Sequence, residues 1–186
     1  MSQLKKDHMF FVPLFSIELE NWGNRKKDFK NLCNIDDPKY KNDEQYSDYY
    51  DYRANGCSYI RTFENLVENE LLLIKKELGG DFWIDGLLTQ KYEKTNHMSV
   101  HNHGNQGYSA ILFVDFDPEH HFSTTFFAPF VNFITGESLS FEPNIKEGTM
   151  IFFPSVLLHQ ASPNKSNKHR TIISFNLSPG CNVLKG

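Results

Sequence analysis

The chain has 186 residues, a formal net charge of −4 and an aromatic content of 15%. This length favours one domain spanning residues 1–186, which can bury a core without disulfides or a structural metal. The acidic balance excludes a broad basic surface for nucleic acid, and no apolar run in the sequence is long enough to span a bilayer. Three widely spaced cysteines, Cys33, Cys57 and Cys181, fit a reducing compartment and form no zinc motif.

The first apolar segment is residues 9–15, which follows a pair of lysines. A short basic stretch before an apolar run is typical of a secretory signal peptide. Glu18 and Glu20 follow the run, however, and no small-residue cleavage site appears. The segment therefore predicts a first β-strand interrupted by Pro13, and we expect a cytoplasmic location.

Residues 20–80 read as a largely helical support region. Residues 22–32 predict a short helix, whereas residues 36–52 are polar, rich in Asp and Tyr, and read as a surface loop. Thr62 is a suitable cap for a second helix that Gly79 and Gly80 end. One side of that helix carries the apolar residues Phe63, Leu66, Val67, Leu71, Ile74 and Leu78.

Residues 82–178 contain short apolar runs separated by turn residues. The run at 108–116 is apolar nearly throughout, as expected for a strand covered on both faces. The other runs are residues 82–88, 138–141, 150–153 and 171–177. Short strands at this spacing, preceded by helices, predict a mainly β fold with N-terminal helices. We expect a double-sheet jelly roll with the helices packed on one sheet.

Three histidines are candidate metal ligands. His101 and His103 are two residues apart, so in an extended strand both side chains point to the same face. His159 follows a strand that Pro154 ends, and strand pairing could bring it beside the other two. Neutral imidazole is a good ligand for iron, zinc, copper or nickel. The alternative is that these histidines are ordinary surface or core residues.

Arg170 stands at the head of the last apolar run. An arginine buried there is costly unless it is paired. Its guanidinium could form an internal ion pair with Asp115 or Glu142. It could instead bind a carboxylate of a ligand through two parallel hydrogen bonds.

Together these residues resemble the iron- and 2-oxoglutarate-dependent oxygenases of the double-stranded β-helix fold, which include the prolyl hydroxylases. The resemblance is closest to a group of small members that phages and bacteria often encode. It covers residues 82–177 strongly, residues 20–80 thinly, and the first strand at residues 10–15. The matching positions are His101-Asn102-His103, Ser109-Ala110, Gly148, Phe153-Pro154-Ser155, His159, Pro163-Asn164, Arg170 and Ile173-Ser174-Phe175-Asn176.

The resemblance implies that His101, His103 and His159 bind Fe(II). It implies that Arg170 holds the 5-carboxylate of 2-oxoglutarate, a co-substrate used with dioxygen. The expected reaction is hydroxylation of a small-molecule or peptide substrate, with neither nucleic acid nor membrane as partner. His103 stands where most of the superfamily has Asp or Glu, which is a departure from the triad of two histidines and one carboxylate. His121, Asp115 and Asp117 are the alternative third ligands.

Two other functions remain open from the sequence. One is a cupin-type metalloenzyme that uses no 2-oxo acid, and the other is a jelly-roll binding or structural protein with packed histidines. Residues 118–136 are too long for a tight hairpin and rich in Phe. They read either as a loop packed on the sheet edge or as a flap that covers the metal.

Overall fold

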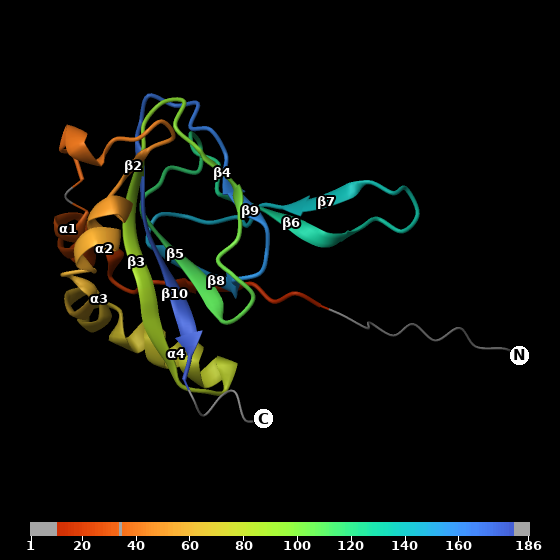
Figure 1. Ribbon diagram of the computed structural model, residues 1–186, viewed down its shortest axis with the longest axis horizontal. Helices are drawn as coiled ribbons and strands as arrows, with labels where there is room; N and C mark the ends of the chain where they lie inside the picture. The colour runs from red at the N-terminus through yellow and green to blue at the C-terminus, as the bar shows by residue number, and fades with distance from the viewer. Residues whose placement is uncertain (1–10, 34, 181–186) are drawn as a thin grey trace, which may run out of the picture.

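The structure is a computed structural model that describes residues 11–33 and 35–180, in which helices cover one side of a pair of β-sheets (Figure 1). The strands are β1 (Phe15–Glu18), β2 (Tyr46–Ser47), β3 (Phe82–Tyr92), β4 (Met98–His101), β5 (Tyr108–Asp115), β6 (Thr124–Val131), β7 (Ser138–Phe141), β8 (Thr149–Pro154), β9 (His159–Ala161) and β10 (Arg170–Pro179). The helices are α1 (Trp22–Leu32), the 3-10 turn η1 (Pro38–Tyr40), α2 (Tyr49–Asn55), α3 (Ile60–Leu66) and α4 (Glu68–Leu78). None of the described helices is long and apolar enough to cross a membrane.

The larger sheet has the strand order β1-β8-β5-β10-β3-β2, and the smaller has the order β4-β9-β6-β7. Neighbouring strands are antiparallel throughout both sheets. The predicted mainly β fold with helices on one sheet is confirmed. The smaller sheet carries His101 at the end of β4 and His159 at the start of β9, so the candidate ligands lie on its short strands.

The central strands of the larger sheet are buried on both faces. Along β10, Ile173 and Phe175 pack in the cluster between the sheet and the helices, whereas Ile172 packs in the cluster between the two sheets. β5 follows the same alternation, with Leu112 toward the helices and Phe113 toward the smaller sheet. This double coverage explains why the sequence of both strands is apolar almost continuously.

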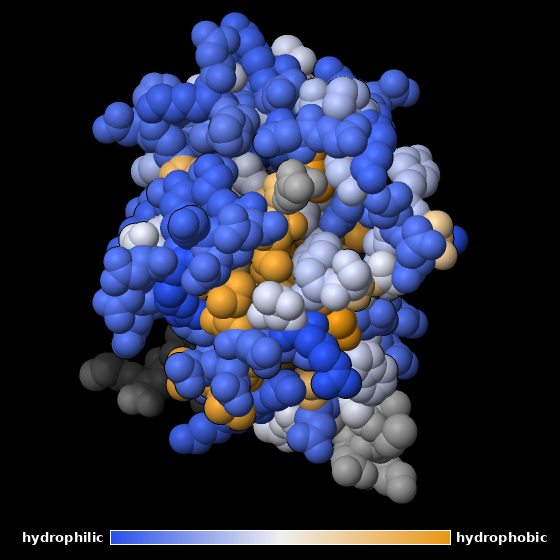
Figure 2. Space-filling model, turned by 90° about the vertical axis from the view of Figure 1, so that its left-hand side faces the viewer, coloured by the Kyte–Doolittle hydropathy of each residue, from blue (hydrophilic) through white to orange (hydrophobic). Residues whose placement is uncertain are grey.

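The helical region follows the prediction in part. The predicted helix at residues 22–32 is α1, but the second predicted helix is divided at Val67 into α3 and α4. Val67 adopts φ −120° and ψ 22°, outside the helical range, and Thr62 lies inside α3 rather than capping it. Gly79 ends α4 in the left-handed conformation, as predicted. Figure 2 shows that the helix-covered side is mainly hydrophilic, with a narrow apolar band near its middle.

Two further predictions need correction. The first strand begins at Phe15, after Pro13 rather than across it, while residue 10 lies outside the described residues. The segment 36–52 is not simply a surface loop, because it contains η1, β2 and the start of α2. Asp48 ties it to the larger sheet by accepting hydrogen bonds from the Thr89 N–H and the Tyr59 hydroxyl.

Of the two interpretations of residues 118–136, the flap over the metal is also corrected. Residues 124–131 form β6, which pairs with β7 in a hairpin that projects from the body of the protein (Figure 1). At its tip, Phe133 and Ile134 are 87% and 95% exposed. Thr124 alone, of residues 118–136, lines the cavity that contains the three histidines. The hairpin therefore does not cover that cavity.

Candidate metal centre

His101 and His159 face each other across the ladder between β4 and β9. They are direct register partners, and their ring centroids are 4.3 Å apart. Each ring is fixed by its own strand, because Nδ1 of His101 lies 2.7 Å from the Ser99 carbonyl oxygen and Nδ1 of His159 lies 2.9 Å from that of Leu157. A carbonyl can only accept, so Nδ1 carries the proton and Nε2 keeps its lone pair in both rings. This is the tautomer that binds a metal through Nε2.

His103 completes the cluster from just beyond the end of β4. Its ring centroid is 5.1 Å from those of both His101 and His159. Its backbone N–H donates to the Ser155 carbonyl oxygen at 2.9 Å, which holds the chain beside β8 after the ladder with β9 has ended. One ring nitrogen from each histidine lies within 4.8 Å of the others, so small side-chain rotations bring all three to one ion. The structure thus brings together all three predicted ligands.

The surroundings favour neutral imidazole rings. Burial lowers the pKa of His103 to about 4 and that of His159 to about 3. A group whose pKa is lowered this far is unprotonated near neutral pH, and the neutral ring is the form that binds metals.

The side chains of the alternative third ligands all form hydrogen bonds or ion pairs with other groups. His121 accepts the Asp117 N–H at Nδ1, and its Nε2 lies 3.1 Å from the Lys168 carbonyl oxygen, so both ring nitrogens are used. Asp115 forms an ion pair with Lys26 at 2.9 Å. Asp117 forms one with Lys168 at 2.6 Å. These contacts leave His103 as the third candidate ligand.

Arg170 lies in the interior between the sheets and is 2% exposed. Its guanidinium donates to the carbonyl oxygens of Phe122 and Ser162 and lies 4.4 Å from the centroid of the Tyr92 ring. Its buried Nε has no hydrogen-bond partner among the described residues. Burial lowers the pKa of Arg170, but from so high a value that the side chain stays charged.

No ion pair joins Arg170 to a carboxylate in the described part of the chain. Asp115 is paired with lysines, and Glu142 accepts a hydrogen bond from the Thr125 hydroxyl. The alternative of an internal ion pair with either acid is therefore wrong for these residues. Arg170 is a buried cation with unused donors, which is the property expected of an anion-binding residue.

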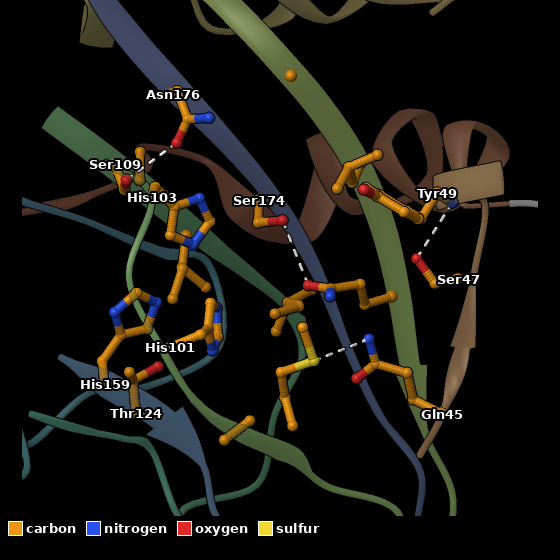
Figure 3. A pocket seen from close by; sticks show the side chains of 18 of the residues that line it. Gln45, Ser47, Tyr49, His101, His103, Ser109, Thr124, His159, Ser174 and Asn176 are labelled. Atoms are coloured by element: carbon orange, nitrogen blue, oxygen red, sulfur yellow. Dashed lines mark hydrogen bonds between the residues drawn. The ribbon is translucent and has the colours of Figure 1, made fainter. Parts of the chain in front are cut away.

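The three histidines face a cavity of about 530 Å³ between the sheets (Figure 3). Much of its wall is neutral and polar, with contributions from Gln45, Ser47, Gln90, Ser109 and Asn176. Gln45 and Ser47 were missed by the sequence analysis because they lie in the segment read as a surface loop. Ser109 and Asn176 belong to the matching motifs, but the sequence assigns them no function.

Comparisons with known proteins give information on the fold and on the enzyme class. Residues 88–176 match the family described as "Putative 2OG-Fe(II) oxygenase". No curated protein sequence matches the chain. The non-heme alpha ketoglutarate dependent carbocyclase SnoK from nogalamycin biosynthesis aligns with a TM-score of 0.68 and 9% identity, over 90% of this chain and 80% of that chain.

Two prolyl hydroxylase structures are also similar. A Pseudomonas putida prolyl-4-hydroxylase aligns with a TM-score of 0.57 and 15% identity, over 90% of this chain and 92% of that chain. The viral collagen prolyl hydroxylase of Paramecium Bursaria Chlorella virus-1 aligns with a TM-score of 0.57 and 15% identity, over 90% of this chain and 96% of that chain. At such identities the structures support a shared double-stranded β-helix fold alone. The family match adds the enzyme class, since residues 88–176 match the model of the 2OG-Fe(II) oxygenase family of oxidoreductases.

Proposed function

We propose that this protein is an Fe(II)- and 2-oxoglutarate-dependent dioxygenase that hydroxylates its substrate. One oxygen atom of dioxygen enters a substrate C–H bond as hydroxyl, and the other enters succinate as 2-oxoglutarate loses carbon dioxide. His101, His103 and His159 hold the iron, and Arg170 holds the co-substrate. The observation that carries the proposal is the convergence of three imidazole rings on one cavity, two of them with Nδ1 tied to a carbonyl.

The histidine cluster suits Fe(II). Imidazole nitrogen is an accepted donor for this ion, and the three rings would hold it at the wall of the cavity. Bound Fe(II), with 2-oxoglutarate as reductant, supplies the dioxygen chemistry. The chain's own contribution is to fix the rings and to shield them: His159 is buried, and Phe126 and Phe153 pack against its ring at centroid distances of 5.9 and 4.8 Å.

Arg170 is not among the residues that line the cavity of the three histidines, but its distance from His159 along the chain matches the length of a five-carbon dicarboxylate. Its guanidinium bonds to Ser162, which lies three residues beyond His159, a span of roughly 10 Å along an extended chain. A 2-oxoglutarate molecule is about 5 Å from first to last carbon. A metal bond of about 2 Å at one end and a hydrogen bond of about 2.9 Å at the other add to this length. The total distance from metal to hydrogen-bond donor is then similar to the span from His159 to Ser162.

The substrate is proposed as a small molecule or a peptide. Two of the similar structures are named as prolyl hydroxylases and one as a carbocyclase of nogalamycin biosynthesis, so both classes occur on this fold. The cavity reaches the surface near Tyr49, Tyr50 and Arg53, where the exposed aromatic rings give a substrate a surface to contact.

Anaerobic titration with Fe(II) and 2-oxoglutarate tests the proposal. We expect one iron per chain and a weak visible charge-transfer band when 2-oxoglutarate joins the iron. His159→Ala should abolish both, because it removes a ligand whose lone pair faces the cluster. His121→Ala is the matched control and should keep full iron stoichiometry, since both its ring nitrogens bond elsewhere. Unchanged stoichiometry in His159→Ala would refute the metal site.

A further inference from the structure

The hairpin of β6 and β7 carries an apolar face that the described part of the chain leaves largely uncovered. Phe126 and Phe141 are opposite residues in the ladder between these strands, so their side chains lie on the same face. Phe126 packs in the cluster between the two sheets. Phe141, and Leu139 two residues before it, therefore continue the inner face of the smaller sheet, yet they are 56% and 40% exposed.

This apolar face extends along the projecting hairpin (Figure 1). Phe130 and Phe133 are both exposed, and their rings stack with centroids 6.0 Å apart. A groove of about 390 Å³ lies beside the hairpin, and Ser140 is the only polar residue among the described residues that line it. Residues 124–141 include one charged residue, Glu137. A contiguous apolar surface with so little charge is typical of a protein–protein contact.

The outer edge of β7 has free main-chain groups. β7 is the last strand in the order of the smaller sheet. The Phe127 N–H donates to the Leu158 carbonyl oxygen at 2.9 Å, so the main chain of Phe127 points away from β7. Ser140 is opposite Phe127 in the ladder, and its own N–H and C=O must then point to the open edge. An edge strand without charged residues or proline is a template for pairing with another strand.

We propose that β7 pairs with β7 of a second copy of this chain, antiparallel and across a two-fold axis at Ser140. The two Ser140 residues then exchange main-chain hydrogen bonds in both directions, and the two smaller sheets join into one. On the inner face, Leu139 of each copy lies opposite Phe141 of the other, which makes two apolar cross-strand pairs. A shift of two residues would place Glu137 opposite Phe141, so the apolar pairing selects the register at Ser140.

The area of the apolar face fits a second copy. The hairpin exposes the large apolar side chains of Phe130, Val131, Phe133, Leu139 and Phe141. With about 150–250 Å² for a fully exposed aromatic side chain, these five present roughly 500 Å² per copy. Two copies then bury roughly 1,000 Å² of apolar surface in addition to the main chain of β7, which is the area that a specific interface needs.

A substrate peptide is a less suitable occupant of this edge. β7 contributes no residue to the lining of the cavity that contains the three histidines. A peptide held along β7 would therefore gain no approach to the candidate metal ligands. The interface is independent of the metal site, so the two proposals stand or fall separately.

Cysteine cross-linking tests the register. Opposite residues that exchange hydrogen bonds have Cα atoms about 5.5 Å apart, within the range of a disulfide. Ser140→Cys should therefore form a covalent dimer under mild oxidation, seen on a non-reducing gel. Ser138→Cys is the matched control on the same exposed face, and its two copies would lie roughly 14 Å apart. Equal cross-linking of the two variants and the parent overturns the proposed pairing.

Sedimentation velocity tests the interface itself. An interface of this area is expected to dissociate in the micromolar range, so the parent should be mainly dimeric at about 200 μM. Ser140→Lys places two like charges opposite each other at the axis and should be monomeric, with the parental far-UV circular dichroism because Ser140 is exposed. Thr62→Lys adds the same charge at an exposed position of α3 and should remain dimeric. A monomeric parent, or a dimeric Ser140→Lys, overturns the proposal.

Discussion

Replacing Arg170 by Lys is expected to weaken 2-oxoglutarate binding while leaving iron binding intact. Lysine keeps the charge but loses the planar pair of donors that fits a carboxylate. A hydrogen bond to a charged group contributes about 1.5–3 kcal/mol, so losing one of two should raise the dissociation constant roughly 10- to 150-fold. Arg170→Ala should lose both bonds, about 3 kcal/mol or more.

The lysine variant is the more informative one because Arg170 also supports the fold. Its guanidinium bonds to the Phe122 and Ser162 carbonyl oxygens and stacks on Tyr92, so truncation to Ala leaves both oxygens without this donor. The melting temperature should accordingly fall in Arg170→Ala, and less in Arg170→Lys.

The assay is calorimetric titration of 2-oxoglutarate into the anaerobic Fe(II)-loaded protein. Arg61→Lys is the matched control, since Arg61 is an exposed arginine on α3. It should bind the co-substrate like the parent. If Arg170→Lys and Arg170→Ala both bind 2-oxoglutarate with parental affinity, Arg170 is a structural residue. A cupin-type metalloenzyme without a 2-oxo acid then becomes the better explanation of the histidine cluster.

Three other expectations concern single substitutions and the thiols of Cys33 and Cys57. Ile173→Ala, at a fully buried position, should lower the free energy of unfolding by about 2–5 kcal/mol in urea denaturation. Ile134→Ala, at the 95% exposed hairpin tip, should change it by less than about 0.5 kcal/mol. Equal effects of the two substitutions would show that the core is misassigned. Burial raises the pKa of the Cys33 thiol and also that of Cys57, so peptide mapping after iodoacetamide treatment at pH 8 should find both labelled more slowly than a free cysteine. His103→Asp should retain iron in anaerobic stoichiometry measurements, because a carboxylate with two histidines also forms an iron site; complete loss would mean that the cluster accepts imidazole alone.

The strands of the larger sheet could be predicted because burial on both faces makes their sequences almost continuously apolar. Residues 108–116 are apolar nearly throughout, because β5 packs on helices with one face and on the smaller sheet with the other. The meeting of His159 with His101 was also foreseeable, because Pro154 ends β8 and the chain must return to pair. In such cases the local pattern and the tertiary structure agree.

The misread elements depend on contacts between residues distant in sequence. The break at Val67 interrupts an apolar periodicity that continues unchanged from α3 into α4, and neither helix has a side-chain cap to mark it. β2 is only two residues long and is held by pairing with β3 and by the bond from the Thr89 N–H to Asp48.

The ladder between β4 and β9 also has a thermodynamic consequence for the whole molecule. His101 and His159 are opposite residues on two short strands that are joined by most of the jelly-roll sequence. An ion bound by both would act as a cross-link that closes this long loop, and the unfolded chain has no such preformed site. Apparent stability should therefore rise with free metal concentration, by about 2.7 kcal/mol at one hundred times the dissociation constant. A chelator would then shift the unfolding temperature of the β-sandwich as well as remove the metal.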